Sequence, residues 1–115
     1  ELGYSYNCLG QYEKAIEILK IAVKQEPKDA YINKELVYAQ IHNNQLDEAI
    51  ATYNKVVIEV TDKTYNTENA FNILGEFYRQ KKIDQFNDWI NKTQIDKDQR
   101  FGAYVEQMKK ELNKK

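Results

Sequence analysis

The fold is decided by the heptapeptide GQYEKAI at residues 10–16, which returns in altered form as NQLDEAI at residues 44–50. The same spacing of 34 residues aligns Leu2 with Leu36 and Val23 with Val57. Self-similarity at a fixed period of this length is typical of proteins built from stacked helical hairpins. The period therefore predicts a repeat protein.

Apolar residues within each unit follow the spacing of one helix face. The first unit places apolar side chains at i, i+1, i+4, i+7 and i+8, namely Ala15, Ile16, Leu19, Ala22 and Val23. One helix later the stripe continues with Ile32, Leu36 and Ala39. Each unit therefore reads as two antiparallel helices, and the methyl side chains of Ala15 and Ala49 mark where two helices approach closely.

The ends of these helices carry their own signals. Gly10 aligns with Asn44, and both residue types tolerate a left-handed backbone at a helix end. Pro27 aligns with Thr61, each just past a helical pattern. The segment 52–61 is rich in β-branched residues and alone favours a strand. We expect the repeat period to override that propensity, because its apolar residues are also helix-spaced.

A third, degenerate unit begins near residue 67. Leu74 precedes Phe86 by 12 residues, against 13 for Leu2 and Ala15. Either the turn at 81–82 is one residue short, or Ile73 holds the core position, and the former register is preferred. Phe86 replaces the small alanine, so helix packing is expected to open there, and extra residues at 63–66 are expected to separate this unit from the second.

The last segment, 98–113, reads as an amphipathic helix that covers the final unit. Its apolar face comprises Phe101, Tyr104, Val105, Met108 and Leu112. Asp96 and Gln99 have the spacing of a capping box. A terminal repeat otherwise exposes its stacking face, so repeat arrays need such a cap.

The chain resembles the tetratricopeptide repeat family. The resemblance rests on two sets of residues: Leu2-Gly3, Tyr6, residues 10–16 and Pro27 in the first unit, and Leu36, residues 46–50 and Tyr53 in the second. It implies an all-α, right-handed α-α superhelix of about three helix-turn-helix repeats plus a capping helix. Expected helices lie near 1–9, 12–25, 30–43, 46–60, 67–81, 84–93 and 98–113.

One domain is expected over 1–115, with repeats at 1–29, 30–63 and 67–96 and the capping helix at 98–113. Glu1 is the sixth residue of its unit by register, so the first repeat is expected to be truncated and the natural protein to extend further at the N-terminus.

A partner-binding groove is expected on the first helices of the units, which line the concave face of such an array. A second stripe beside the core stripe predicts its members, with equivalents in the first and third units: Tyr4, Asn7, Tyr31, Lys34, Tyr38, Ile41, His42, Asn72 and Arg79. Cys8 is the equivalent of His42, and Glu76 joins the groove in the preferred register. Tyrosine suits such a face, because it offers a large contact area with few rotamers to freeze.

The function that the resemblance implies is non-catalytic recognition of a partner protein or peptide. One groove type in the family grips a C-terminal carboxylate, but Tyr4 and Asn69 stand where its asparagine and lysine belong. Self-association through exposed repeat ends is the alternative. An RNA-binding helical repeat is disfavoured, because it would have 35-residue units and a basic groove.

Composition excludes several other classes. The formal charge is −1, from 17 basic and 18 acidic residues, which gives no general attraction to nucleic acid or to anionic membranes. No apolar run approaches the ~20 residues of a membrane helix. One cysteine and one histidine supply too few ligands for zinc and no evident catalytic pair, so no enzyme, metal or cofactor is expected. A single thiol is compatible with the cytoplasm, although the sequence does not fix the compartment.

Overall fold

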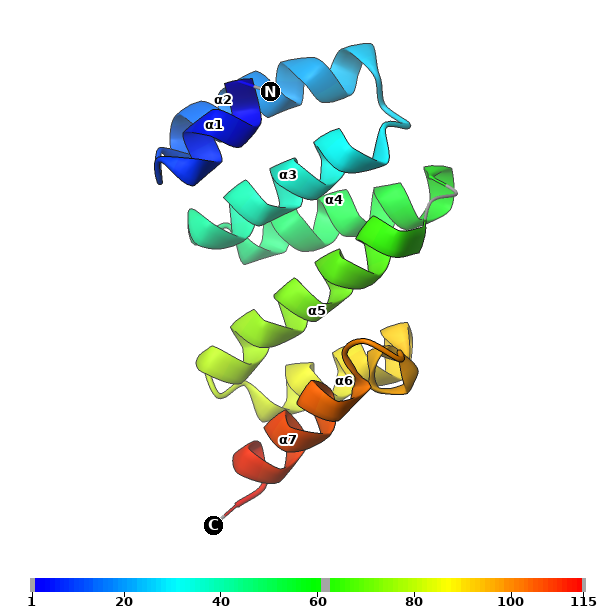
Figure 1. The fold of residues 1–115 in the computed structure, drawn as a ribbon. Coiled ribbons are helices and arrows are strands. Elements are labelled where there is room, and N and C mark those ends of the chain that lie inside the picture. Colours follow the sequence, from blue (N-terminus) through cyan, green and yellow to red (C-terminus); the bar gives the residue numbers. More distant parts are fainter. Residues whose placement is uncertain (1, 61–62, 115) are drawn as a thin grey trace. The chain divides into compact units, whose positions relative to one another are not determined.

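The computed structural model describes residues 2–60 and 63–114, and within those ranges the chain folds into helices alone (Figure 1). The expected all-α, helical-repeat class is confirmed. The elements are α1 (Leu2–Cys8), α2 (Tyr12–Gln25), α3 (Ala30–His42), α4 (Leu46–Glu59), α5 (Lys63–Arg79), α6 (Ile83–Thr93), a 3-10 turn (Ile95–Lys97) and α7 (Gly102–Leu112).

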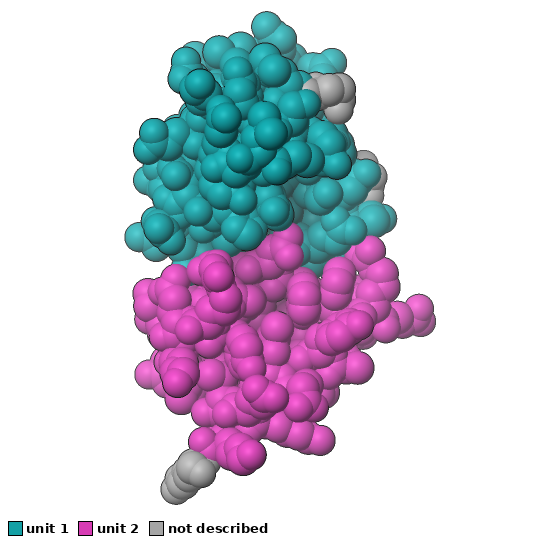
Figure 2. All heavy atoms as spheres, turned by 60° about the vertical axis from the view of Figure 1, so that its left-hand side comes forward, with its two compact units in different colours: residues 1–69 teal, residues 70–115 magenta. Residues whose placement is uncertain are grey.

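Two compact units make up the chain, residues 1–69 and 70–115, and the division falls within α5 (Figure 2). Each unit has its own core. The expectation of a single domain, with repeats divided at 29, 63 and 96, stays a prediction. Thr61, the expected stop signal of the second repeat, lies outside the described residues, as does Glu1.

In the first unit, α1 packs on α2, and α3 packs on both α2 and α4. The core joins α2 to α3 through the expected stripes, with Ala15, Ile16 and Leu19 meeting Leu36 and Ala39. Ala15 and Ala49 are fully buried, which confirms the close helix contacts. Gly3 allows a similar approach, because a Cβ atom there would stand 2.5 Å from the Leu19 side chain.

The turns inside the three hairpins share one backbone conformation. Gly10, Asn44 and Lys81 all adopt a left-handed backbone, with φ of 74°, 60° and 56°. In each turn this residue donates its N–H to the carbonyl three residues back, and the following residue donates to the carbonyl five residues back. Side chains that differ completely thus occupy one Schellman-type turn, and the equivalence of Gly10 and Asn44 is confirmed.

Turn geometry also settles the register of the third unit. Lys81 follows Asn44 by 37 residues, and the same offset carries Leu36 onto Ile73 and Ala49 onto Phe86. The preferred register, with a shortened turn and Leu74 in the core position of Leu36, is therefore wrong. Ile73 and Leu74 are both fully buried, which is why the sequence did not distinguish them.

Two local expectations are also corrected. The extra residues 63–66, which were expected to precede a helix starting near residue 67, form the first turn of α5. Asp96 and Gln99 do not form a capping box: the Asp96 carboxylate accepts from Lys109 Nζ at 3.2 Å, and Asp98 Oδ1 receives the backbone N–H groups of Arg100 and Phe101. By contrast, α4 runs as a helix to Glu59, so the repeat period did override the β-branched composition.

Candidate partner-binding groove

A buried polar contact joins α1 to α3 in the first unit. Asn7 sits in the last turn of α1, and its Nδ2 donates to the backbone carbonyl of Glu35 at 3.1 Å and to Glu35 Oε1 at 3.0 Å. Only 4% of Asn7 and 5% of Glu35 is exposed. A carboxylate this deeply buried requires hydrogen bonds and a counter-charge. Lys34 Nζ supplies the charge, 3.5 Å from Glu35 Oε2.

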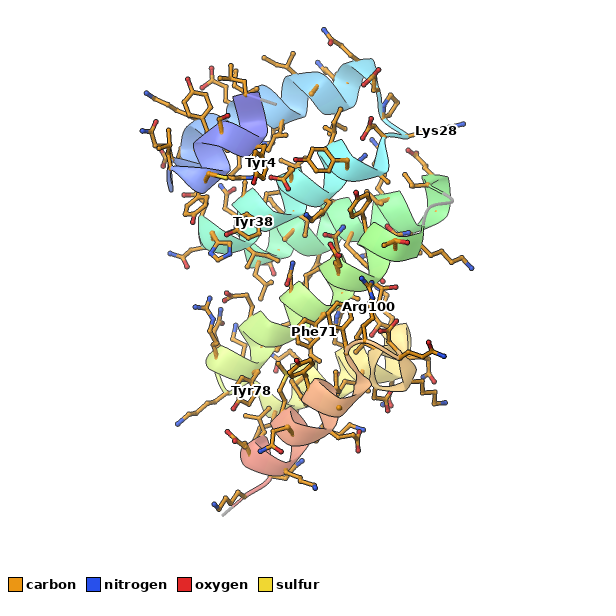
Figure 3. The ribbon with its side chains drawn as sticks, in the orientation of Figure 1. Tyr4, Lys28, Tyr38, Phe71, Tyr78 and Arg100 are labelled. Atoms are coloured by element: carbon orange, nitrogen blue, oxygen red, sulfur yellow. The ribbon has the colours of Figure 1, made fainter. Side chains whose placement is uncertain are left out.

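Directly over this contact lies a pocket of about 260 Å³. Its lining comes from α1 and α3: Tyr4, Asn7, Cys8, Lys34, Glu35 and Tyr38. Two tyrosines, one from each helix, stand in the lining (Figure 3). The structure thus brings together Tyr4, Asn7, Lys34 and Tyr38, four of the residues expected in a groove.

One polar atom in the lining lacks a partner. Asn7 Oδ1 is buried and accepts no hydrogen bond from any residue that the structure describes. A buried acceptor left in this state costs about 1–3 kcal/mol. The lining residue Asn7 thus carries a buried hydrogen-bond acceptor without a partner among the described residues, next to the Glu35 carboxylate.

The two tyrosines differ in their surroundings. A hydrogen bond with the Cys8 side chain is the main reason that the pKa of Tyr4 is raised, and the charge of Glu35 adds a smaller part. Burial is the main cause of the raised pKa of Tyr38, to which Tyr12 and again Glu35 contribute. Both phenols therefore stay neutral at physiological pH, and both feel the negative charge of Glu35.

Several side chains surround the ammonium group of Lys34. Besides Glu35 it lies 3.9 Å from Glu68 Oε2, and its ammonium stands 5.7 Å from the ring centre of Tyr31 and 5.5 Å from that of Tyr65. Two carboxylates and two aromatic faces thus share one cation. The cluster of Lys34, Glu35 and Glu68 has one more negative charge than positive.

Other expected groove residues lie elsewhere in the first unit. Tyr31 lines a separate hollow of about 480 Å³ beside the α2–α3 and α4–α5 connections. His42 stacks on the ring of Tyr12, with centroids 5.2 Å apart, and its ring is tilted by 44° against that of Tyr38, with centroids 4.2 Å apart. Ile41 is only 5% exposed, so the expectation that it presents a surface to a partner is wrong. It fills an apolar site at the position that Asn7 occupies in α1.

Asn72 and Arg79 belong to the second unit. By the turn register, Asn72 is the equivalent of Glu35, and Arg79 is the equivalent of His42. Arg79 pairs with Glu76, a buried residue at the position of Ala39. The preferred register required Glu76 to be the equivalent of Tyr38. Its position shows that it is not. A role for Asn72 or Arg79 in binding stays a prediction.

Glu35 is the important residue that the sequence reasoning missed. It stands four residues after Tyr31 and three before Tyr38, so helical spacing already placed it on the same stripe. The predicted stripe of Tyr31, Lys34, Tyr38, Ile41 and His42 does not include it. Cys8, noted only as the equivalent of His42, also lines the pocket.

Among residues 2–60 and 63–114, no group of three or more His, Cys, Asp or Glu side chains is arranged to hold a metal ion. No helix in the described part of the chain has both the length and the apolar character needed to cross a membrane.

Comparisons with known proteins agree with the repeat architecture. A family model described as tetratricopeptide repeat matches residues 9–67, which include the α1–α2 turn and all of α2, α3 and α4. A TPR repeat-containing protein of Methanocaldococcus jannaschii is 35% identical over 79 residues. That alignment covers 69% of this chain but 14% of the relative, so the chain spans a small part of that protein's length. No solved structure matches the chain significantly.

Proposed function

The chain belongs to the tetratricopeptide repeat family, and on that premise we propose that it binds an extended segment of a partner protein on the α1–α3 face of its first unit. Domains of this family generally mediate protein–protein interaction and are typically non-catalytic scaffolds. As part of the same proposal, we infer that this chain is also non-catalytic.

The observation that carries the proposal is the pocket between α1 and α3, where two tyrosines flank a buried polar pair. Tyrosine dominates many recognition surfaces, because burying one ring gains much contact area for two frozen torsions. Binding energy tends to concentrate on such aromatic anchors around a desolvated centre. The Asn7–Glu35 contact provides that centre.

The size of the pocket favours a side chain over a cofactor. Sites for drug-sized ligands measure about 300–1,000 Å³ and enclose most of the ligand. The pocket here is about 260 Å³ and is built from two helices alone. It is suited to one or two side chains of a longer segment, whose remaining residues would run along the exposed surface of the helices.

The test is selection of random linear peptides displayed on phage against the full chain. We expect the Y4A/Y38A double variant to weaken the selected peptides by about tenfold or more, which corresponds to ~1.4 kcal/mol. The matched control is Tyr104→Ala, because Tyr104 lies on α7 and is 64% exposed. Selected peptides that bind the wild-type chain and the double variant equally would overturn the proposal, provided that far-UV circular dichroism shows the variant to be folded.

Self-association is the second candidate, and a specific observation favours it. Leu2 and Ile21, on α1 and α2, are each 54% exposed, whereas Leu36, the equivalent of Leu2, is buried against the preceding hairpin. A second copy of the chain would cover these apolar side chains in the same way. Sedimentation velocity over a range of concentrations should then show a dimer that a Leu2→Lys/Ile21→Lys variant abolishes.

A further inference from the structure

We propose that the first turn of α5, residues 63–66, unwinds to admit the bound segment to Tyr31 and Lys34. The inference rests on the proposed function and adds a conformational step to binding at the same face. The structure contains the long helix Lys63–Arg79. The residues around Asn66 also suit a shorter helix that begins at residue 67, and four observations support an exchange between the two.

Asn66 stands where the preceding hairpin has a helix cap. The turn register carries Asn66 onto Asp29, whose Oδ1 accepts the backbone N–H of Ile32 at 2.9 Å and so caps α3. Asparagine is as well suited to this capping position as aspartate. In the long α5 the corresponding N–H, that of Asn69, is used within the helix, and Asn66 Oδ1 is buried without a partner among the described residues. Unwinding of residues 63–66 frees this N–H for Asn66 Oδ1.

A second buried amide raises the free energy of the long helix. Asn69 is 1% exposed, and both polar atoms of its side chain lack hydrogen-bond partners among the described residues. Its equivalent is Ile32, an apolar residue that packs against the core of the first unit. A buried amide without partners is costly, whereas a buried isoleucine is stabilising. Asn66 and Asn69 therefore weaken the packing of the end of α5 that unwinds.

The charges of α5 also favour the shorter helix. Lys63 is the first residue of α5, where a positive charge opposes the helix dipole, and the first turn contains no acidic residue. A helix that begins at residue 67 leaves Lys63 outside and brings Glu68 into its first turn. A carboxylate at that end of a helix is stabilising.

Contacts of the first turn hold the long helix in place and cover part of α3. The Tyr65 ring lies 6.1 Å from that of Tyr31, and Lys34 Nζ is 5.5 Å from its centre. Within α5, Thr67 Oγ1 donates to the Lys63 carbonyl at 2.9 Å. Unwinding withdraws Tyr65 from both residues of α3. Because Lys34 also lines the pocket between α1 and α3, the surface offered to the bound segment then extends from that pocket along α3.

Hydrogen exchange of the α5 amides tests the unwinding. Asn66→Ala removes the cap of the shorter helix, so we expect the amides of Thr67 and Glu68 to exchange about fivefold more slowly, the ordinary effect of losing an N-cap. Asn66→Asp keeps a capping oxygen and places a charge in the buried site of the long helix, so the same amides should exchange about threefold faster. The matched control is Asp29→Ala, which removes an existing cap and should speed exchange at Ile32. Faster exchange in both Asn66 variants is the result of a residue that only packs, and it would overturn the inference.

Peptides selected on phage connect the unwinding to binding. Only the unwound fraction of the chain accepts the whole segment, so a fivefold smaller fraction lowers the apparent affinity by the same factor. We therefore expect peptides that depend on Tyr4 and Tyr38 to bind Asn66→Ala about fivefold more weakly than the wild type. Equal affinities would overturn the inference while the proposed function stands. Peptides that bind the Y4A/Y38A variant and the wild type equally would overturn the proposed function, whereas exchange at Thr67 and Glu68 tests the unwinding independently.

Discussion

The hairpins α3–α4 and α5–α6 share the same turn but fill the space between their helices in opposite ways. In α3–α4, Ala49 is fully buried, and Thr52 Oγ1 donates to Gln40 Oε1 at 2.9 Å. An offset of 37 residues carries Ala49 onto Phe86, Thr52 onto Trp89 and Gln40 onto Phe77. These three aromatic residues are buried, with the rings of Phe77 and Trp89 at 6.2 Å in an edge arrangement.

This difference shows that the hairpin does not require a small alanine at this position. Alanine is one of two ways in which the space between the helices is filled. A methyl group at this position lets two helices approach, and the neighbouring contact is a hydrogen bond. A phenyl ring at the same position is accommodated when the neighbouring residues also become aromatic and when Trp89 Nε1 donates to the backbone of Ala70 at 2.8 Å. The residues change as a set, because a well-packed interior tolerates changes in shape only when they compensate.

The largest expected effect comes from restoring the alanine in the aromatic hairpin. Phe86→Ala gives α5–α6 the residue found in the other two hairpins, yet we expect it to destabilise the second unit by about 3–5 kcal/mol, because the cavity left by a fully buried ring is not refilled. Urea denaturation followed by the fluorescence of Trp89, the single tryptophan, measures this loss. An unchanged midpoint would show that the three aromatic residues do not act as a set.

The reverse substitution should also destabilise its hairpin, but by a smaller free energy. Ala49→Phe forces a ring between α3 and α4, where Gln40 and Thr52 leave no aromatic surroundings for it, and overpacking of this kind costs about 1–3 kcal/mol. Hydrogen exchange of the α3 and α4 amides reports the effect. If the triple variant A49F/T52W/Q40F recovers wild-type protection, the three aromatic residues form a packing unit that can be transferred from one hairpin to the other.

Substitutions in the turns should change the free energy of unfolding by smaller amounts and in opposite directions. Gly10→Ala should destabilise by about 1 kcal/mol, since φ is 74° there and the space around a new Cβ atom is open, so that only backbone strain acts. Lys81→Gly should stabilise by about 0.5 kcal/mol, because relief of strain at φ 56° is partly offset by the greater entropy of the unfolded chain. Thermal unfolding of the two variants compares them, and equal signs would contradict a common turn.

The smallest expected effect is a dependence on pH confined to the second unit. Tyr78 donates to Glu111 Oε2 at 2.6 Å, and this hydrogen bond lowers the pKa of Glu111 and raises that of Tyr78. A lowered carboxyl pKa contributes stability above the unfolded value of about 4.5, and that contribution is lost as pH falls through the folded value. The raised phenol pKa places the alkaline loss above pH 10.

Tyr78→Phe should therefore reduce the difference in urea midpoint between pH 6 and pH 3, read from Trp89 fluorescence. The first unit provides the control, since hydrogen exchange of α3 amides should respond to acid equally in both proteins. If the second unit of the variant is as sensitive to acid as that of the wild type, the Tyr78–Glu111 hydrogen bond does not cause the acid sensitivity.

The sequence predicted most of the first unit because its repetition is strict. An offset of 34 residues fixed α2, α3 and α4 to within one residue, and it fixed the left-handed turns at Gly10 and Asn44. It failed where neighbouring residues are chemically alike. Ile73 and Leu74 are both apolar and both buried, so spacing alone did not decide which one is the equivalent of Leu36.

The candidate site was predicted less completely, and for a different reason. Helical spacing placed Tyr4, Asn7, Lys34 and Tyr38 on one face, and these four line the pocket. The pattern did not reveal that Ile41 is buried or that Asn7 reaches Glu35 across two helices, because both depend on contacts between residues far apart in sequence. Periodicity identifies which face a residue occupies, but burial depends on what packs against that face.

The turn shared by Gly10, Asn44 and Lys81 has a consequence for recognising eroded repeats. The match to the family model ends at residue 67, yet the backbone reverses direction once more at Lys81 with the same torsion and the same two hydrogen bonds. A search that scores this torsion together with its two hydrogen bonds, with residue identity ignored, would find three such turns within residues 2–60 and 63–114. The geometry of this turn therefore extends beyond the residues that the family model matches.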